Sequence, residues 1–183
     1  MSGEPDGEVL RRFARGDEGA FEQLFRQFER EVYGWILRIT RDPSGAEDVL
    51  VESFWRAFRG RAQFDPARSF GAWMRRIATN AALDHLRALK RIGGWQPTAD
   101  ALAAPVGPDR DTNEAIALAF GRLPPDLQIV AALALLEEQP YADIADALGV
   151  PEGTVKSRVF RATRMLREEL ARLGVRREGG GRS

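Results

Sequence analysis

The sequence predicts an all-α protein made of two small helical domains joined by a flexible linker. Apolar residues recur at helical spacing on both sides of the chain's centre, and the sequence has no strand-type alternation of useful length. Residues 92–110 interrupt the pattern with three Pro and three Gly, which is typical of a connector. We therefore expect a first domain over 1–91, a linker over 92–110, a second domain over 111–175 and a disordered Gly-rich tail over 176–183.

Composition limits the class of protein. The 183 residues are 44% hydrophobic and 30% charged, as in a globular protein, and they include no cysteine. Disulfides and cysteine-ligated zinc are therefore excluded. No apolar run approaches the roughly 20 residues of a membrane span, and the acidic start, Met1 to Glu8, is unlike a signal peptide. We expect a cytoplasmic protein without membrane insertion.

The formal net charge is zero, but the charges are segregated along the chain. Gly71–Arg91 holds five basic residues against one acid, and Glu152–Glu178 holds eight against four. Asp42–Glu52 has four acids and no base, and Asp100–Asp146 has nine acids against two bases. This distribution favours basic faces for phosphate and acidic faces for a protein partner.

The first domain begins with a helical period over Gly19–Ile39, and Asp42-Pro43 ends that helix and starts another. Ser44 to Glu47 is similar to a capping box, so the next helix is expected from about Ala46 to Arg59. One of its faces carries, at spacings of three and four residues, Asp48, Glu52, Trp55 and Arg59. An acidic face bearing an indole suits a docking surface for a basic partner. The alternative, with Trp55 in the core and the acids solvated, stays open.

The predicted helix over Phe70–Arg91 carries a mixed basic and aromatic stripe. Within an arc of roughly 80° lie Trp73, Arg76, Asn80, Asp84, Arg87 and Arg91. Cations for phosphates and an aromatic ring for stacking are what single-stranded DNA binding requires. The preceding loop contains Phe64, Arg68 and Ser69, which could form a pocket for an unstacked base. The alternative is that Trp73 packs in the core and the arginines pair with nearby acids.

The second domain contains the pattern of a helix-turn-helix. Tyr141–Leu148 is a short supporting helix, Gly149 suits a left-handed cap, and Pro151 prevents the helix from continuing. The next helix, from Glu152, has an apolar side formed by Val155, Val159, Ala162 and Leu166. Its other side carries Lys156, Ser157, Phe160, Arg161 and Arg164, the chemistry that a DNA major groove requires. The alternative is a surface helix with a solvated basic face.

Catalysis is not expected. His85 is the single histidine, and its neighbours Ala81, Ala82 and Leu86 indicate a helix-surface or core residue. No Gly-rich phosphate loop and no cluster with metal-ligand spacing occurs in the sequence. We therefore expect no catalytic residues, no metal and no cofactor.

These parts, taken in order, resemble bacterial sigma factors of the extracytoplasmic-function (ECF) group of the sigma-70 family, over nearly all of residues 10–173. The segments that carry the resemblance are GDEGAFEQLFRQF (16–28), DPSGAEDVLVESFWRAFR (42–59), FGAWMRRIATNAALDHLR (70–87), RLPPDLQIVAAL (122–133) and YADIADALGVPEGTVKSRVFRATRMLREEL (141–170). The resemblance implies sigma domain 2, a linker and sigma domain 4. It implies core RNA polymerase, promoter DNA and an anti-sigma factor as partners, with contacts to the polymerase clamp helices and flap region.

The resemblance also implies roles for individual residues. The expected minus-35 contacts are Thr154, Lys156, Ser157, Arg158, Phe160, Arg161 and Arg164. The expected minus-10 contacts are Phe64, Arg68, Ser69, Trp73, Arg76, Asn80, Asp84 and Arg87. The expected contacts with core polymerase are Glu47, Asp48, Glu52, Trp55 and Arg59.

The chain departs from the ECF pattern at three positions. Val51 stands where the family usually has Gln, Gln128 where it usually has Arg, and Thr163 where Arg is frequent. Two other functions remain open beside that of a sigma factor. A stand-alone helix-turn-helix regulator would explain residues 111–175 but would leave the stripe over 73–91 without a role, and the departures at Val51 and Gln128 leave open a sigma-like decoy that titrates an anti-sigma factor.

Overall fold

Helices form nearly all of the structure, a computed structural model that describes residues 3–92 and 110–175. No strand occurs within these two ranges. In chain order the elements are α1 (Gly7–Ala14), α2 (Glu18–Thr40), α3 (Pro43–Gly60), the 3-10 turn η1 (Arg61–Gln63), α4 (Phe70–Arg91), α6 (Arg110–Arg122), α7 (Pro125–Ala131), the π-helical turn η2 (Ala132–Leu136), α8 (Tyr141–Leu148) and α9 (Glu152–Arg172). The all-α prediction is confirmed. Residues 93–109 of the predicted linker and all of the predicted 176–183 tail lie outside the described ranges.

Aspartate side chains cap the first three helices at their N-termini, and Asp6 caps α1 by accepting a hydrogen bond from the N–H of Glu8. Asp17 accepts a hydrogen bond from the backbone N–H of Ala20 at 2.7 Å, and this bond, followed by one from Arg12, lowers the pKa of Asp17. Asp42 caps α3 by accepting from the N–H groups of Ser44 and Gly45. The predicted capping box at Ser44–Glu47 is therefore wrong: Asp42 already satisfies the first free N–H groups, and Ser44 lies inside the first turn.

The first three long helices, α2, α3 and α4, pack against one another and form the first domain's core. A buried polar pair joins two of them, since the indole N–H of Trp35 on α2 donates to Thr79 Oγ1 on α4 at 2.9 Å. Thr79 in turn donates to the carbonyl oxygen of Arg75 at 2.7 Å. Both groups are thus satisfied inside an otherwise apolar interface, where an unpaired one would cost about 1–3 kcal/mol.

A cluster of aromatic rings attaches α1 to the start of α4. Phe13 is fully buried, and its ring centroid lies within 6.4 Å of those of Phe21, Phe64, Phe70 and Trp73. Burying one phenylalanine side chain contributes about 1.5–3 kcal/mol. This cluster determines where the loop between η1 and α4 can lie.

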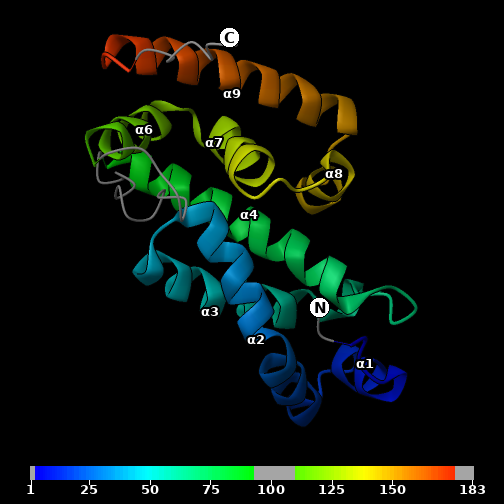
Figure 1. The fold of residues 1–183 in the computed structure, drawn as a ribbon. Coiled ribbons are helices and arrows are strands. Elements are labelled where there is room, and N and C mark those ends of the chain that lie inside the picture. The colour runs from blue at the N-terminus through cyan, green and yellow to red at the C-terminus, as the bar shows by residue number, and fades with distance from the viewer. Residues whose placement is uncertain (1–2, 93–109, 176–183) are drawn as a thin grey trace.

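In the second half of the chain, α9 lies across α6, α7 and α8 (Figure 1). Figure 1 also shows α4 between the α2–α3 pair and the α7–α8 pair, so α4 packs against helices of both halves of the chain. Apolar side chains from α7, η2, α8 and α9 continue the core of the first domain, namely Ile129, Val130, Leu133, Ile144, Ala145, Ala147, Val155 and Val159. The two halves are therefore packed together in this structure.

Candidate nucleic-acid interface

The helix-turn-helix forms as the sequence predicts. Helix α8 ends at Leu148, Gly149 caps it in the left-handed conformation with φ 65°, and α9 starts at Glu152 after Pro151. A residue with a side chain would be strained at Gly149 because of its positive φ. The predicted inward side of α9 is confirmed, since its four apolar side chains Val155, Val159, Ala162 and Leu166 are all buried.

The opposite face of α9 is open to solvent. Phe160 is 71% exposed, which is unusual for a phenylalanine, and Ser157, Arg161 and Arg164 are exposed beside it. Lys156 donates to Glu152 one turn earlier at 2.8 Å, and this hydrogen bond raises the pKa of Lys156. Thr154 and Arg158 lie half-buried at the edge of this face. The face combines hydrogen-bonding groups, an aromatic ring and cations, as base edges and phosphates require.

The polar stripe on α4 is also present, but protein groups contact several of its side chains. Asn80 and Arg76 are exposed, and Trp73 is half-buried with its ring 4.8 Å from that of Phe64. Asp84 accepts a hydrogen bond from Arg56 on α3 at 2.7 Å. The alternative reading of the sequence thus holds in part, since Trp73 packs on the aromatic cluster and some of the charged residues of the stripe are ion-paired.

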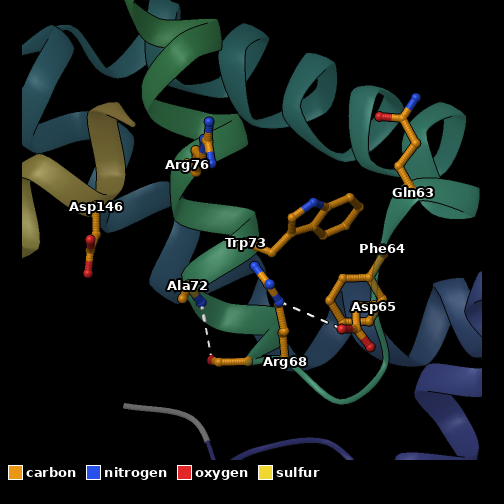
Figure 2. Close-up of a pocket in the computed structure, with 9 residues that line it drawn as sticks. Gln63, Phe64, Asp65, Arg68, Ala72, Trp73, Arg76 and Asp146 are labelled. Atoms are coloured by element: carbon orange, nitrogen blue, oxygen red, sulfur yellow. Dashed lines mark hydrogen bonds and ion pairs between the residues drawn. The ribbon is translucent and has the colours of Figure 1, made fainter. Parts of the chain in front are cut away.

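A pocket of about 580 Å³ opens beside the first turns of α4. Its lining residues are Gln63, Phe64, Asp65, Arg68, Ser69, Ala72, Trp73, Arg76 and Asp146. Figure 2 shows Trp73, Arg68 and Phe64 close together, with Asp146 of α8 on the other side of Ala72 and Arg76. Four predicted minus-10 residues besides Trp73 therefore line one site. Phe64 is 5% exposed and packs on the aromatic cluster, so it supports the pocket from beneath.

Helix α3 presents an apolar and acidic face to solvent. Val51 is 56% exposed and Trp55 55% exposed, so the alternative that placed Trp55 in the core is wrong. Glu47 and Asp48 are exposed on the same helix. Large apolar side chains surrounded by charge are typical of a protein-binding surface.

Hydrogen bonds between charged side chains connect residues within α3 and join α3 to α4. Glu52 accepts hydrogen bonds from Arg56 at 2.8 Å and from Arg59 at 3.4 Å. Arg56 also donates to Asp84, and these two acids raise the pKa of Arg56. Glu52 and Arg59 are thus coupled through Arg56 to the α4 stripe.

Ion pairs join the two halves of the chain where α4 meets α7. Asp126 on α7 pairs with Arg87 of the α4 stripe at 2.8 Å and lies 3.9 Å from Arg158 of α9. Lys90 donates to the carbonyl oxygen of Leu123 at 2.6 Å, and its partial burial lowers its pKa. Glu137, which follows η2, pairs at 2.7 Å with Arg41, the residue that caps the C-terminus of α2. One carboxylate, Asp126, therefore contacts an arginine from each candidate DNA-binding face.

Comparison with known families identifies both halves. The family Sigma-70 region 2 matches residues 24–92, and the family Sigma-70, region 4 matches residues 113–166. The chain belongs to the sigma-70 family. The predicted two-domain class is confirmed, and this sigma factor is an initiation factor and not an enzyme.

Similar proteins place the sigma factor in the ECF group. It is 37% identical to the ECF RNA polymerase sigma factor SigM of Mycobacterium tuberculosis, over 92% of this chain and 84% of SigM. It is 33% identical to the RNA polymerase sigma-H factor of Pseudomonas aeruginosa (88% and 92% covered) and 33% identical to the ECF RNA polymerase sigma-E factor of Haemophilus influenzae (90% and 95% covered).

Two solved structures share the fold. CnrH in complex with the cytosolic domain of CnrY has a TM-score of 0.58 and 23% identity, with 91% of this chain and 97% of CnrH covered. RpoE in complex with the anti-sigma factor NepR from Bartonella quintana has a TM-score of 0.53 and 23% identity, with 82% and 96% covered.

The three residues that depart from the family pattern differ in their exposure and in their hydrogen bonds. Val51 is exposed on the α3 face, so it alters that surface and not the core. Gln128 is buried and donates to the carbonyl oxygen of Phe120 at 3.0 Å, a neutral bond inside the second domain. Thr163 donates to the carbonyl oxygen of Val159 at 2.9 Å and so is bonded within its own helix.

Two groups of contacts were not predicted from the sequence. The first is the set of ion pairs between the halves, in which Asp126 and Glu137 are the acids. The second is the attachment of the N-terminal segment to α4 through Glu4 and Phe13. The apolar spacing of Val9, Leu10 and Phe13 is a signal that would have located α1.

In residues 3–92 and 110–175, no helix is long and apolar enough to cross a membrane. Within the same ranges, no group of three or more His, Cys, Asp or Glu side chains is placed to hold a metal ion. His85 is half-buried, with its Nε2 close to Gly45 on α3, so it lies between helices.

Proposed function

We propose that this sigma factor works in the cytoplasm, where it binds core RNA polymerase and directs initiation at promoters with distinct minus-35 and minus-10 elements. The observation that carries the proposal is the presence, in one chain, of an open cationic and aromatic face on α9 and a pocket beside the basic stripe of α4. The α9 face suits intact duplex DNA, and the pocket beside α4 suits an unpaired strand.

The α9 face reads the minus-35 element in the major groove. Arg161 and Lys156 are exposed cations able to reach base edges, and Phe160 offers an apolar contact for a thymine methyl group. Arg158, at the half-buried edge, contacts phosphate. The remaining contacts come from Thr154, Ser157 and Arg164.

The α4 stripe and the pocket hold the melted minus-10 strand. An unstacked base enters the pocket beside Trp73, while Arg68 and Arg76 at its rim neutralise phosphates. Asn80, Asp84 and Arg87 continue this track along α4. Phe64 positions Trp73 from below, and Ser69 offers a hydroxyl group to the base.

The α3 face binds core polymerase. Trp55 and Val51 supply apolar area, and the acids Glu47, Asp48 and Glu52 complement basic residues on the clamp helices of the largest subunit. Arg59 lies at the end of the same face. The second domain contacts the flap region.

The two halves separate when the promoter is bound. Elements centred near minus-35 and minus-10 are about 25 base pairs apart, or roughly 85 Å of duplex. A compact chain of this length has a radius of gyration of only roughly 16 Å. Contacts such as Arg87–Asp126 must therefore break, and residues 92–110 can span roughly 60 Å when extended.

An anti-sigma factor is a further proposed partner. RpoE is bound to one in its solved complex, and the fold of that protein is similar to this one. A sigma-like decoy, which would bind an anti-sigma factor without starting transcription, is a second candidate because Val51 changes the proposed polymerase face.

Reconstitution with core polymerase on promoter DNA tests these functions together. We expect the chain to bind core and to produce transcripts from specific start sites. Tight duplex binding without polymerase would instead support a stand-alone regulator. The decoy would be supported if the chain binds an anti-sigma factor but produces no transcripts, and if Val51→Gln restores transcription.

A further inference from the structure

The residues that precede α1 are attached to the body of the first domain at several points. The side-chain amide of Gln27 donates to the carbonyl oxygen of Gly3 at 2.7 Å, and Pro5 is buried. Glu4, between them, accepts hydrogen bonds from the N–H of Phe70 at 2.8 Å and from the hydroxyl of Ser69 at 3.2 Å. The segment lies outside residues 24–92, which match the Sigma-70 region 2 family.

Glu4 contacts α4 at the edge of the pocket. Ser69 is the N-cap residue of α4, is exposed, and lines the pocket beside Ala72 and Trp73. Its hydroxyl oxygen accepts a hydrogen bond from the N–H of Ala72 at 3.3 Å, which Figure 2 marks with a dashed line. The same hydroxyl group thus has one bond to its own helix and one to Glu4.

These two bonds determine what Ser69 can offer to a bound base. A hydroxyl group has one proton to donate and two lone pairs that accept. An ionised carboxylate only accepts, so the Ser69 proton points at Glu4, while Ala72 occupies one lone pair. One lone pair is left, and toward the pocket Ser69 is a hydrogen-bond acceptor.

We propose that Glu4 is a positioning residue for base selection, which acts by making Ser69 an acceptor toward the pocket. This inference rests on the proposed capture of an unpaired minus-10 base there. An acceptor favours a base whose exocyclic group is an amino group, as in adenine N6 and cytosine N4. It disfavours the exocyclic carbonyl groups of thymine O4 and guanine O6.

The substitution Glu4→Gln reverses the polarity of Ser69 with almost no change of shape. The N–H of Phe70 needs an acceptor, so the amide oxygen of the glutamine takes that position. Its NH₂ group then faces Ser69 and donates to the hydroxyl oxygen. Both lone pairs of Ser69 are now occupied, and its proton is released toward the pocket.

The test uses reconstituted holoenzyme and open-bubble promoter DNA in which each unpaired minus-10 position carries adenine, cytosine, guanine or thymine in turn. At one position the wild type is expected to favour amino over keto bases by about 3- to 10-fold, the effect of one hydrogen bond. Glu4→Gln should abolish or invert this ratio there while leaving binding to core polymerase unchanged. Ser69→Ala should also abolish it, and Glu4→Gln should then have no further effect on base preference.

A matched control is Glu8→Gln, which removes an exposed charge of α1 whose partners are Arg11 and Arg15. It should leave the base ratio as in the wild type. Equal weakening on all four bases by Glu4→Gln would overturn the proposal and reduce Glu4 to a helix cap. An unchanged ratio would overturn it as well. If the wild-type holoenzyme shows no affinity for any bubble, the proposed function fails instead.

Discussion

The outer face of α9 and the stripe along α4 differ in how much of each the protein itself uses. On α9, Phe160 is 71% exposed, and Arg161 is open to solvent. On α4, Trp73 packs on three aromatic rings of the first domain, and Arg87 is paired with Asp126. Under the proposed function, duplex can therefore reach α9 directly, whereas an unpaired strand must compete with protein contacts along α4.

The largest expected difference between the two faces is the effect on stability of losing their aromatic side chains. We expect Trp73→Ala to lower the free energy of unfolding by about 3 kcal/mol, because the ring contacts Phe13, Phe64 and Phe70. Phe160→Ala should change it by less than about 0.5 kcal/mol, since the ring is exposed. Urea denaturation of both variants measures the difference, and equal losses would contradict it.

A milder substitution at Trp73 separates its role in function from its role in folding. Trp73→Phe keeps an aromatic ring in the cluster and should stay folded. We expect it to slow promoter opening by the holoenzyme more than it weakens duplex binding, because the smaller ring offers less area for base stacking. Permanganate reactivity of unpaired thymines reports the opening. Unchanged opening would remove Trp73 from the proposed minus-10 contacts.

The α9 face was predictable from sequence because one helix determines it. Its periodicity alone separates Val155 and Val159 from Lys156 and Arg161, and no other element is needed. The α4 helix was likewise predicted with its observed bounds, Phe70–Arg91. What the sequence did not contain was the set of contacts that distant segments make with α4. Asp126 pairs with the Arg87 side chain from 39 residues away, and Glu4 accepts from the backbone N–H of Phe70 from 66 residues away.

The cap of α3 shows a second limit of prediction from sequence. Both Asp42 and Ser44 are good N-cap residues, and the pattern to Glu47 favoured Ser44. The choice depends on which side chain meets the free N–H groups, and Asp42 does so because the chain turns there after Arg41, whose φ is 53°. A local turn geometry of this kind is not readable from residue types alone.

A smaller effect is expected from the loss of a single cation on the open face. Arg161→Ala should weaken minus-35 binding by about 1–3 kcal/mol and relax the base preference at one position. Arg167→Ala on the same helix is the matched control, because Arg167 is exposed but lies about 9 Å farther along the helix axis than Arg161 and is not among the proposed minus-35 contacts. Competition binding with single-base variants of the minus-35 element measures both. Equal weakening on every sequence would make Arg161 a phosphate contact.

The smallest expected effect concerns Asp126, which contacts both faces at once. Asp126→Asn removes the charge that pairs with Arg87 at 2.8 Å and lies near Arg158, so both arginines lose an acidic partner that competes with phosphates, and Arg87 keeps only its longer contact with Asp84. The pairs are partly exposed and worth about 0.2–1 kcal/mol, so affinity of the full chain for a single-stranded minus-10 oligonucleotide should rise by no more than about fivefold. Asp143→Asn, an equal charge change on the exposed side of α8, controls for general attraction to DNA. If both variants gain equally, Asp126 does not compete with DNA, and the α4 stripe is as accessible as α9.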